Sequence, residues 1–84
     1  MFSIILMVII LQWNSQSIIA HGNELKNALN DWDKKPDIIC IQETWLKEGK
    51  TYNLPGYNIY RCDRKSASKN YGGGCAIYGE KILL

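Results

Sequence analysis

Two polar residues, Asn14 and Glu43, each follow directly after an apolar segment that has the composition of a β-strand. If the two strands are parallel neighbours, both side chains emerge at the same edge of the sheet, where α/β folds place their ligands. A carboxylate there suits Mg²⁺, which typically takes one or two protein carboxylates together with phosphate oxygens. An amide can donate to a phosphate oxygen or orient a water without adding negative charge. The pair therefore suits phosphate chemistry, although a glutamate in this place, taken alone, is more often a solvated strand end.

The segment that delivers Glu43 is an apolar run after a helix breaker. Pro36 precedes Ile38–Ile41, which is short, rich in β-branched residues and apolar at both alternating positions. Such a run is typical of a strand covered on both faces. Val8–Trp13 is the corresponding first strand and delivers Asn14.

A helix is predicted between these two strands. Over Glu24–Asp33 the apolar residues recur with helical spacing, and these residues are Leu25, Ala28, Leu29 and Trp32. Asn23 can cap the helix, and Lys34 and Lys35 suit its negative end before Pro36 closes it. Residues 8–43 therefore read strand, helix, strand, and a crossover of this length predicts parallel strands with a right-handed connection.

The second half of the chain predicts a hairpin. After the loop 44–53 and a turn at Leu54–Tyr57, strands are expected at Tyr57–Arg64 and Cys75–Tyr78. Their short polar connection predicts antiparallel pairing. Gly72–Gly74 precede a strand rather than a helix, so they indicate a bulge or close backbone packing and not a phosphate-binding loop.

Composition bounds what the chain can be. Its 84 residues fit one small domain at most, and 46% hydrophobic with 21% charged residues excludes a disordered tail. The formal charge of +2 does not by itself imply a polyanionic partner. Three cysteines without a Cys-x-x-Cys spacing exclude a zinc site and a disulfide framework, and they are expected to be small core residues in a reduced compartment. His21 is expected in a loop rather than as a catalytic base.

The N-terminus is apolar from Met1 to Leu11 apart from Ser3. This run is too short for a membrane helix, which needs about twenty residues, and no membrane association is expected. A secretory signal would fit the length but lacks a positive charge ahead of it and a good cleavage site. We therefore expect residues 1–7 to be an apolar leader or strand extension, and residues 8–84 to form the domain.

Five segments in this order resemble the endonuclease/exonuclease/phosphatase family, and most of all the apurinic-like endonuclease domain of non-LTR (LINE-type) retrotransposons. These segments are 11–14, 36–44, 54–57, 61–64 and 72–78. The resemblance implies the N-terminal part of a four-layered α/β/β/α sandwich, Mg²⁺ or Mn²⁺ as cofactor, and hydrolysis of phosphodiester bonds in DNA, in the nucleus. It also implies that Glu43 binds the metal and that Asn14 is the active-site asparagine.

The chain departs from the family pattern in two ways. Gln16 stands where many relatives have Asp or Asn, which puts a metal role there in doubt. The later tyrosine, the Asp-x-Asn pair and the terminal Asp-His dyad of the family do not occur, so we expect weak metal binding and no activity from these residues alone. Arg61, Asp63 and Arg64 are expected to be paired surface charges on the hairpin, without a catalytic role.

Two other interpretations stay open. One is a fragment of a phosphatase or phospholipid diesterase of the same fold. The other is a non-catalytic remnant or interaction module that keeps the strands without the site.

Overall fold

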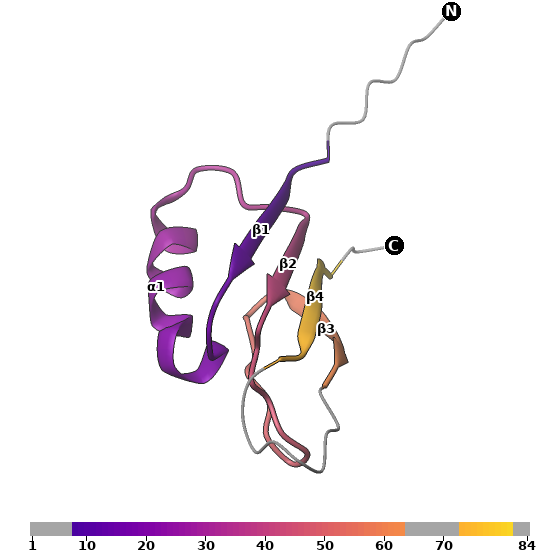
Figure 1. The fold of residues 1–84 in the computed structure, drawn as a ribbon. Coiled ribbons are helices and arrows are strands. Elements are labelled where there is room, and N and C mark those ends of the chain that lie inside the picture. The colour runs from indigo at the N-terminus through magenta and orange to yellow at the C-terminus, as the bar shows by residue number, and fades with distance from the viewer. Residues whose placement is uncertain (1–7, 64–72, 82–84) are drawn as a thin grey trace, which may run out of the picture.

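The computed structural model describes residues 8–63 and 73–81, which form one helix on a four-stranded sheet (Figure 1). The elements follow one another as β1 (Ile10–Asn14), α1 (Ile18–Asp31), β2 (Ile38–Gln42), β3 (Tyr57–Cys62) and β4 (Cys75–Glu80). In space the strands are ordered β1-β2-β4-β3. The α/β class expected from the sequence is therefore confirmed.

The strand pairings match the predicted ones. β1 and β2 are parallel, from Ile10 opposite Ile38 to Asn14 opposite Gln42, with α1 as the crossover. β3 and β4 form the antiparallel hairpin, and β4 also pairs antiparallel with β2. Strand bounds differ by one or two residues from the prediction, since Val8 precedes β1 and β4 continues to Glu80. The expectations for residues 1–7 and for Arg64 lie outside the described residues.

The helix begins earlier than the sequence predicted, at Ile18 rather than Glu24, and ends at Asp31. Ser17 is its N-cap and accepts a hydrogen bond from the backbone N–H of Ala20 at 3.2 Å. The predicted start at Glu24 left Gly22 outside the helix. Gly22 instead lies buried inside α1, where any Cβ would overlap the ring of Tyr52. The glycine permits a close approach between the helix and the loop after β2.

The predicted place of Trp32 in the buried stripe is wrong. Trp32 is the C-cap residue of α1, with extended backbone, and its side chain is 41% exposed. The predicted helix, which ended at Asp33, extends two residues beyond the observed end at Asp31. A tryptophan at helical spacing from Leu25 and Leu29 looks the same in sequence whether or not the helix has already ended.

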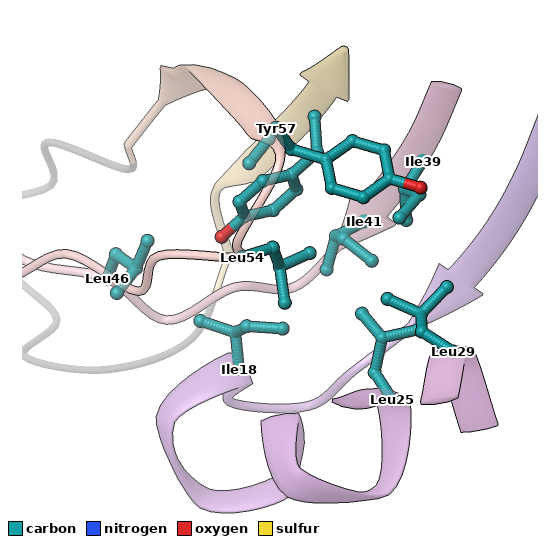
Figure 2. Close-up of a cluster of buried hydrophobic side chains, with 10 residues drawn as sticks. Ile18, Leu25, Leu29, Ile39, Ile41, Leu46, Leu54 and Tyr57 are labelled. Atoms are coloured by element: carbon teal, nitrogen blue, oxygen red, sulfur yellow. The ribbon is translucent and has the colours of Figure 1, made fainter. Parts of the chain in front are cut away.

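The hydrophobic core lies between α1, one face of the sheet and the loop after β2 (Figure 2). Its buried side chains are Ile18, Leu25, Leu29, Ile39, Ile41, Leu46, Leu54, Tyr57, Ala76 and Tyr78. Burying each of the large ones contributes about 1.5–3 kcal/mol relative to leaving it in water. The core therefore fixes β2 through Ile39 and Ile41, and with it the position of the residue that follows the strand.

The opposite face of the sheet is uncovered in the described part of the chain. Ile38 and Cys40 are only half-buried, so the expectation that β2 is covered on both faces is not met there. Cys62 and Cys75 are exposed, which corrects the prediction that the cysteines are core residues. The reason is register: side chains alternate between faces, and these residues fall on the side away from α1.

Within residues 8–63 and 73–81, no helix has the length and apolar character to cross a lipid bilayer.

Candidate functional site

Asn14 and Glu43 meet at the carboxyl ends of the two parallel strands. Asn14 is the last residue of β1 and pairs with Gln42, so Glu43 lies one residue beyond the end of β2. The side-chain Nδ2 of Asn14 donates a hydrogen bond to Oε2 of Glu43 at 2.5 Å. The structure thus brings together the two residues that the sequence singled out, and it does so by a direct contact.

A buried serine holds the backbone on which Glu43 stands. Ser15 is 3% exposed, and its hydroxyl lies within hydrogen-bonding distance of the carbonyl oxygens of Gln42 (3.2 Å) and Glu43 (2.9 Å). Its backbone N–H also donates to Gln42 at 2.9 Å. Sequence reasoning missed this residue, because a serine directly after a strand looks like part of an ordinary polar break.

The ladder between the strands continues into the loops that follow them. Ser17 N–H donates to the carbonyl of Glu43 at 2.9 Å, and Ile18 N–H donates to the carbonyl of Thr44 at 3.0 Å. This pattern carries the pairing of β1 with β2 up to the first residue of α1. The start of the helix and the backbone of Glu43 are therefore fixed to each other.

The glycines before β4 bind the backbone of the residues that follow Glu43. Thr44 N–H donates to the carbonyl of Gly74 at 3.3 Å, and Trp45 N–H donates to that of Gly73 at 3.0 Å. Gly73 (φ 75°) and Gly74 (φ 81°) both have a positive φ, which a residue with a side chain rarely adopts. This contact agrees with the expected close backbone packing at the strand start, while Gly72 lies outside the described residues.

Backbone strain is concentrated in the same loops. Among the described residues, positive φ at a non-glycine position occurs only at Gln16 (45°), Ser17 (88°), Glu43 (51°) and Trp45 (55°). Such conformations cost on the order of 1–3 kcal/mol each and persist only where the surroundings impose them. Their clustering around the Asn14–Glu43 contact is typical of a functional site.

Arg61 anchors the loop after β2 and is not part of the contact. Its guanidinium binds both carboxylate oxygens of Asp63, with an ion pair at 2.6 Å, and donates to the backbone carbonyls of Lys47 and Lys50. The hydrogen bond to Asp63 raises the pKa of Arg61. The predicted pairing of charges at Arg61 and Asp63 is present, with a loop-bracing role added.

His21 also has a structural partner. It lies in α1 rather than in a loop, and its Nδ1 is 2.7 Å from the carbonyl oxygen of Ser15. Because that carbonyl can only accept, Nδ1 carries the proton and donates. The imidazole thereby supports the same turn that positions Glu43.

The donor set fits part of a Mg²⁺ site. Glu43 offers a carboxylate whose Oε1 makes no hydrogen bond to any described residue, and one carboxylate is within the range that Mg²⁺ uses with phosphate oxygens and water. No group of three or more His, Cys, Asp or Glu side chains suited to a metal ion occurs in ranges 8–63 and 73–81. Glu43 is therefore a candidate ligand that leaves most coordination positions to other groups.

The chain is similar in sequence to known proteins over most of its length. The model of the Endonuclease/Exonuclease/phosphatase family matches residues 11–78. A probable RNA-directed DNA polymerase from transposon BS of Drosophila melanogaster is 35% identical over 74 residues, which are 88% of this chain and 8% of that protein.

Two solved structures have the same fold. An AP endonuclease from Archaeoglobus fulgidus superposes with a TM-score of 0.65 at 28% identity, over 87% of this chain and 27% of that chain. The 3′ phosphatase NExo from Neisseria, bound to a product DNA hairpin, gives a TM-score of 0.67 at 24% identity, over 90% of this chain and 28% of that chain. The chain spans less than a third of these structures.

Proposed function

Because the chain belongs to the endonuclease/exonuclease/phosphatase family, we propose that residues 8–84 are the N-terminal part of a Mg²⁺-dependent DNA endonuclease domain of the retrotransposon type. The observation that carries this proposal is the hydrogen bond between Asn14 and Glu43 at the carboxyl ends of two adjacent parallel strands. The similarity to a transposon polymerase and to an AP endonuclease favours DNA as the substrate.

Each residue of the pair has a distinct role in the proposal. Glu43 would hold the metal through its carboxylate, while the bond from Asn14 to Oε2 fixes the orientation of that carboxylate. The second proton on Asn14 Nδ2 is free to donate to a phosphate oxygen, since an amide nitrogen carries two. Mg²⁺, when bound, supplies charge neutralisation and polarises the phosphoryl oxygen. Mn²⁺ is expected to replace it.

We also propose that these residues alone bind the metal weakly and do not cleave DNA. Glu43 is the single carboxylate at the contact among the described residues. A positioned general acid or base is typically worth ~10²–10⁴-fold in rate, and His21, the described imidazole, donates to a backbone carbonyl instead. Cleavage then requires catalytic groups that residues 8–63 and 73–81 do not supply.

A metal titration tests the role of Glu43. We expect Mn²⁺ added to the ¹⁵N-labelled chain to broaden the amide signals of residues 14 and 43 and the side-chain amide of Asn14 first. Glu43→Gln removes this selective broadening, whereas the matched variant Asp37→Asn, at the other end of β2, retains it. Broadening that begins elsewhere, or that survives in Glu43→Gln, contradicts the proposal and favours a non-catalytic remnant.

A nicking assay tests inactivity separately. Supercoiled plasmid incubated with the chain and Mg²⁺ is expected to stay intact over hours. Nicking that disappears in Glu43→Ala would refute the proposed inactivity while supporting the assigned site. Nicking that persists in Glu43→Ala would count against both.

A further inference from the structure

Two cysteines lie opposite each other on the hairpin. Cys62 is the last residue of β3 and Cys75 is the first residue of β4, and the antiparallel register pairs them directly. Both are exposed and both thiols are free. Residues 63–74 separate the two cysteines in the sequence, so the register of the strands, and not the spacing, makes them neighbours.

The distance between the two residues suits a disulfide bond. The backbone N–H of Lys81 donates to the carbonyl of Gly56, which extends the register by one pair and marks that pair as hydrogen-bonded. Hydrogen-bonded and non-hydrogen-bonded pairs alternate along antiparallel strands. Cys62 and Cys75 lie an even number of pairs further along, so they form a pair of the same kind. The Cα atoms of such a pair are about 5.5 Å apart, a usual separation for a disulfide.

A disulfide in this place is strained and therefore easily reduced. Directly opposite residues have Cβ atoms about 4.5–5.5 Å apart, and hydrogen-bonded pairs lie at the wider end, whereas a disulfide holds its Cβ atoms about 3.5–4.5 Å apart. Bond formation thus requires the two strands to draw together locally. Cys62 and Cys75 form the final pair of the β3–β4 ladder in the described part of the chain, where such an adjustment disturbs the fewest neighbouring pairs. Strained or exposed disulfides are the labile ones.

Cys75 lies beside the backbone that carries Glu43. The carbonyl of the preceding residue, Gly74, accepts a hydrogen bond from the N–H of Thr44 at 3.3 Å. In the sheet, Cys75 is paired with Gln42. A bond that fixes Cys75 therefore restricts the backbone on both sides of Glu43.

We propose that Cys62 and Cys75 form a reversible disulfide within the chain, which closes the end of the hairpin and steadies the loop that carries Glu43. Because both partners belong to one hairpin, the bond needs no other chain. The inference does not use the assignment of Glu43 as a metal ligand.

The oxidant in this step is a low-molecular-weight disulfide. The thiolate of one cysteine attacks a sulfur of the oxidant, which forms a mixed disulfide and releases the first small thiolate. The thiolate of the other cysteine then attacks the protein sulfur of the mixed disulfide, and the second small thiolate leaves. Two electrons and two protons pass from the two protein thiols, so the oxidant becomes two small thiols.

The third cysteine provides a matched control. Cys40 on β2 is opposite Ile77, two positions along the register from the pair of Gln42 with Cys75. Diagonal neighbours of this kind have Cα atoms about 7–8 Å apart, too far for a disulfide without movement of the backbone. Cys40 is therefore expected to remain a free thiol.

Treatment of the full chain with oxidised glutathione, followed by alkylation and peptide mass spectrometry, tests the proposal. The folded chain is expected to contain Cys62 linked to Cys75, with Cys40 alkylated. Cys40→Ser is expected to form the same link, whereas Cys62→Ser and Cys75→Ser form no link within the chain. Links that include Cys40, links between chains alone, or the same mixture of links as in the urea-unfolded chain overturn the proposal, and so does a folded chain that keeps all its thiols.

A second measurement tests the effect on the loop. Oxidation is expected to slow hydrogen exchange of the Thr44 N–H at least about tenfold, because local opening of the loop becomes rarer. The N–H of Asp37, which donates to Ile9 at the other end of β2, is the internal reference and should change by less than about twofold. Equal slowing at both positions, or none at Thr44, contradicts the proposed effect on the loop. A chain that forms the disulfide but shows no selective Mn²⁺ broadening contradicts the proposed function and leaves this inference standing.

Discussion

Two carboxylates flank β2, and their side chains have different kinds of hydrogen-bond partner. Asp37 precedes the strand, and its side chain accepts the backbone N–H of Ile9 at 2.8 Å while its own N–H donates to the carbonyl of Ile9. Glu43 follows the strand, and its side chain is bound by the Asn14 amide rather than by backbone. Asp37 satisfies the main chain and stabilises the fold, whereas Glu43 leaves an oxygen available for a ligand.

The backbone conformation also differs between the two residues. Asp37 lies on ordinary backbone in a regular ladder that extends to Glu80. Glu43 has a φ of 51° and is held there by Ser15 and Ser17. The proposed ligand therefore differs from the structural carboxylate in two observable ways: another side chain binds it, and its backbone has a positive φ.

The largest expected effect comes from weakening the packing of β2, the strand between the two carboxylates, against the core. Ile39→Ala empties a fully buried site and should lower the free energy of unfolding by about 2–5 kcal/mol. Ile38→Ala, at the adjacent residue on the sheet face away from α1, should cost well under half of that. Urea denaturation followed by circular dichroism measures both. Equal losses would mean that this face is covered in solution.

The next effect separates the two carboxylates directly. Asp37→Ala leaves the N–H of Ile9 without its charged acceptor and should cost about 1.5–3 kcal/mol in unfolding free energy. Glu43→Ala should change stability by less than about 0.5 kcal/mol, because its side-chain contact is exposed. The same denaturation experiment compares them, and the reverse order would break the contrast drawn above.

Two buried tyrosines make the ends of β2 sensitive to alkali. Tyr57 donates to the carbonyl of Pro36 and Tyr78 to that of Tyr52, each at 2.6 Å. Burial raises the pKa of Tyr78 to about 12, and it raises that of Tyr57 above the ordinary 10.0. Above pH 10 the unfolded chain loses these protons first. Stability present below pH 10 is therefore lost as the pH rises toward 12.

The size of this loss can be measured. For Tyr78 alone it should amount to about 2 kcal/mol, and Tyr78→Phe should remove that share of the pH dependence. Urea midpoints at pH 9 and at pH 11.5, for the parent chain and the variant, provide the test. A parent chain with the same midpoint at both values contradicts the assigned burial.

The smallest effect concerns strain. Glu43→Gly should be more stable than Glu43→Ala by up to about 1 kcal/mol, since glycine adopts positive φ without the cost paid by a residue with a Cβ. Thermal unfolding of the two variants measures the difference. A more stable alanine variant would show that Glu43 is not strained in solution.

Much of this arrangement could be predicted from sequence. The strand that ends at Asn14, the strand that ends just before Glu43, and the helix between them follow from apolar periodicity, which reflects burial against a single core. The hairpin partner followed from its short polar connection. Adjacency of Asn14 and Glu43 then required only that the two strands be parallel neighbours.

The remainder depends on contacts between distant residues. The sequence gives no reason for a glycine inside a helix at position 22. The reason is the ring of Tyr52, which occupies the space that a side chain on Gly22 would need. Ser15 reads as a polar residue until the carbonyls of Gln42 and Glu43 are placed beside its hydroxyl. Exposure of Cys62 and Cys75 depends on which face a cover occupies, and alternation along a strand does not reveal that.

The strand order has a consequence for synthesis on the ribosome. β4 lies between β2 and β3, so the two earlier strands have no common neighbour until residues 75–80 have left the exit tunnel. Contacts of such long sequence separation form slowly, and the apolar strand β2 must wait with one edge unpaired. A pause in translation that keeps residues 75–80 inside the tunnel would therefore prolong the exposure of this edge of β2, and the edge can be paired only after β4 has emerged.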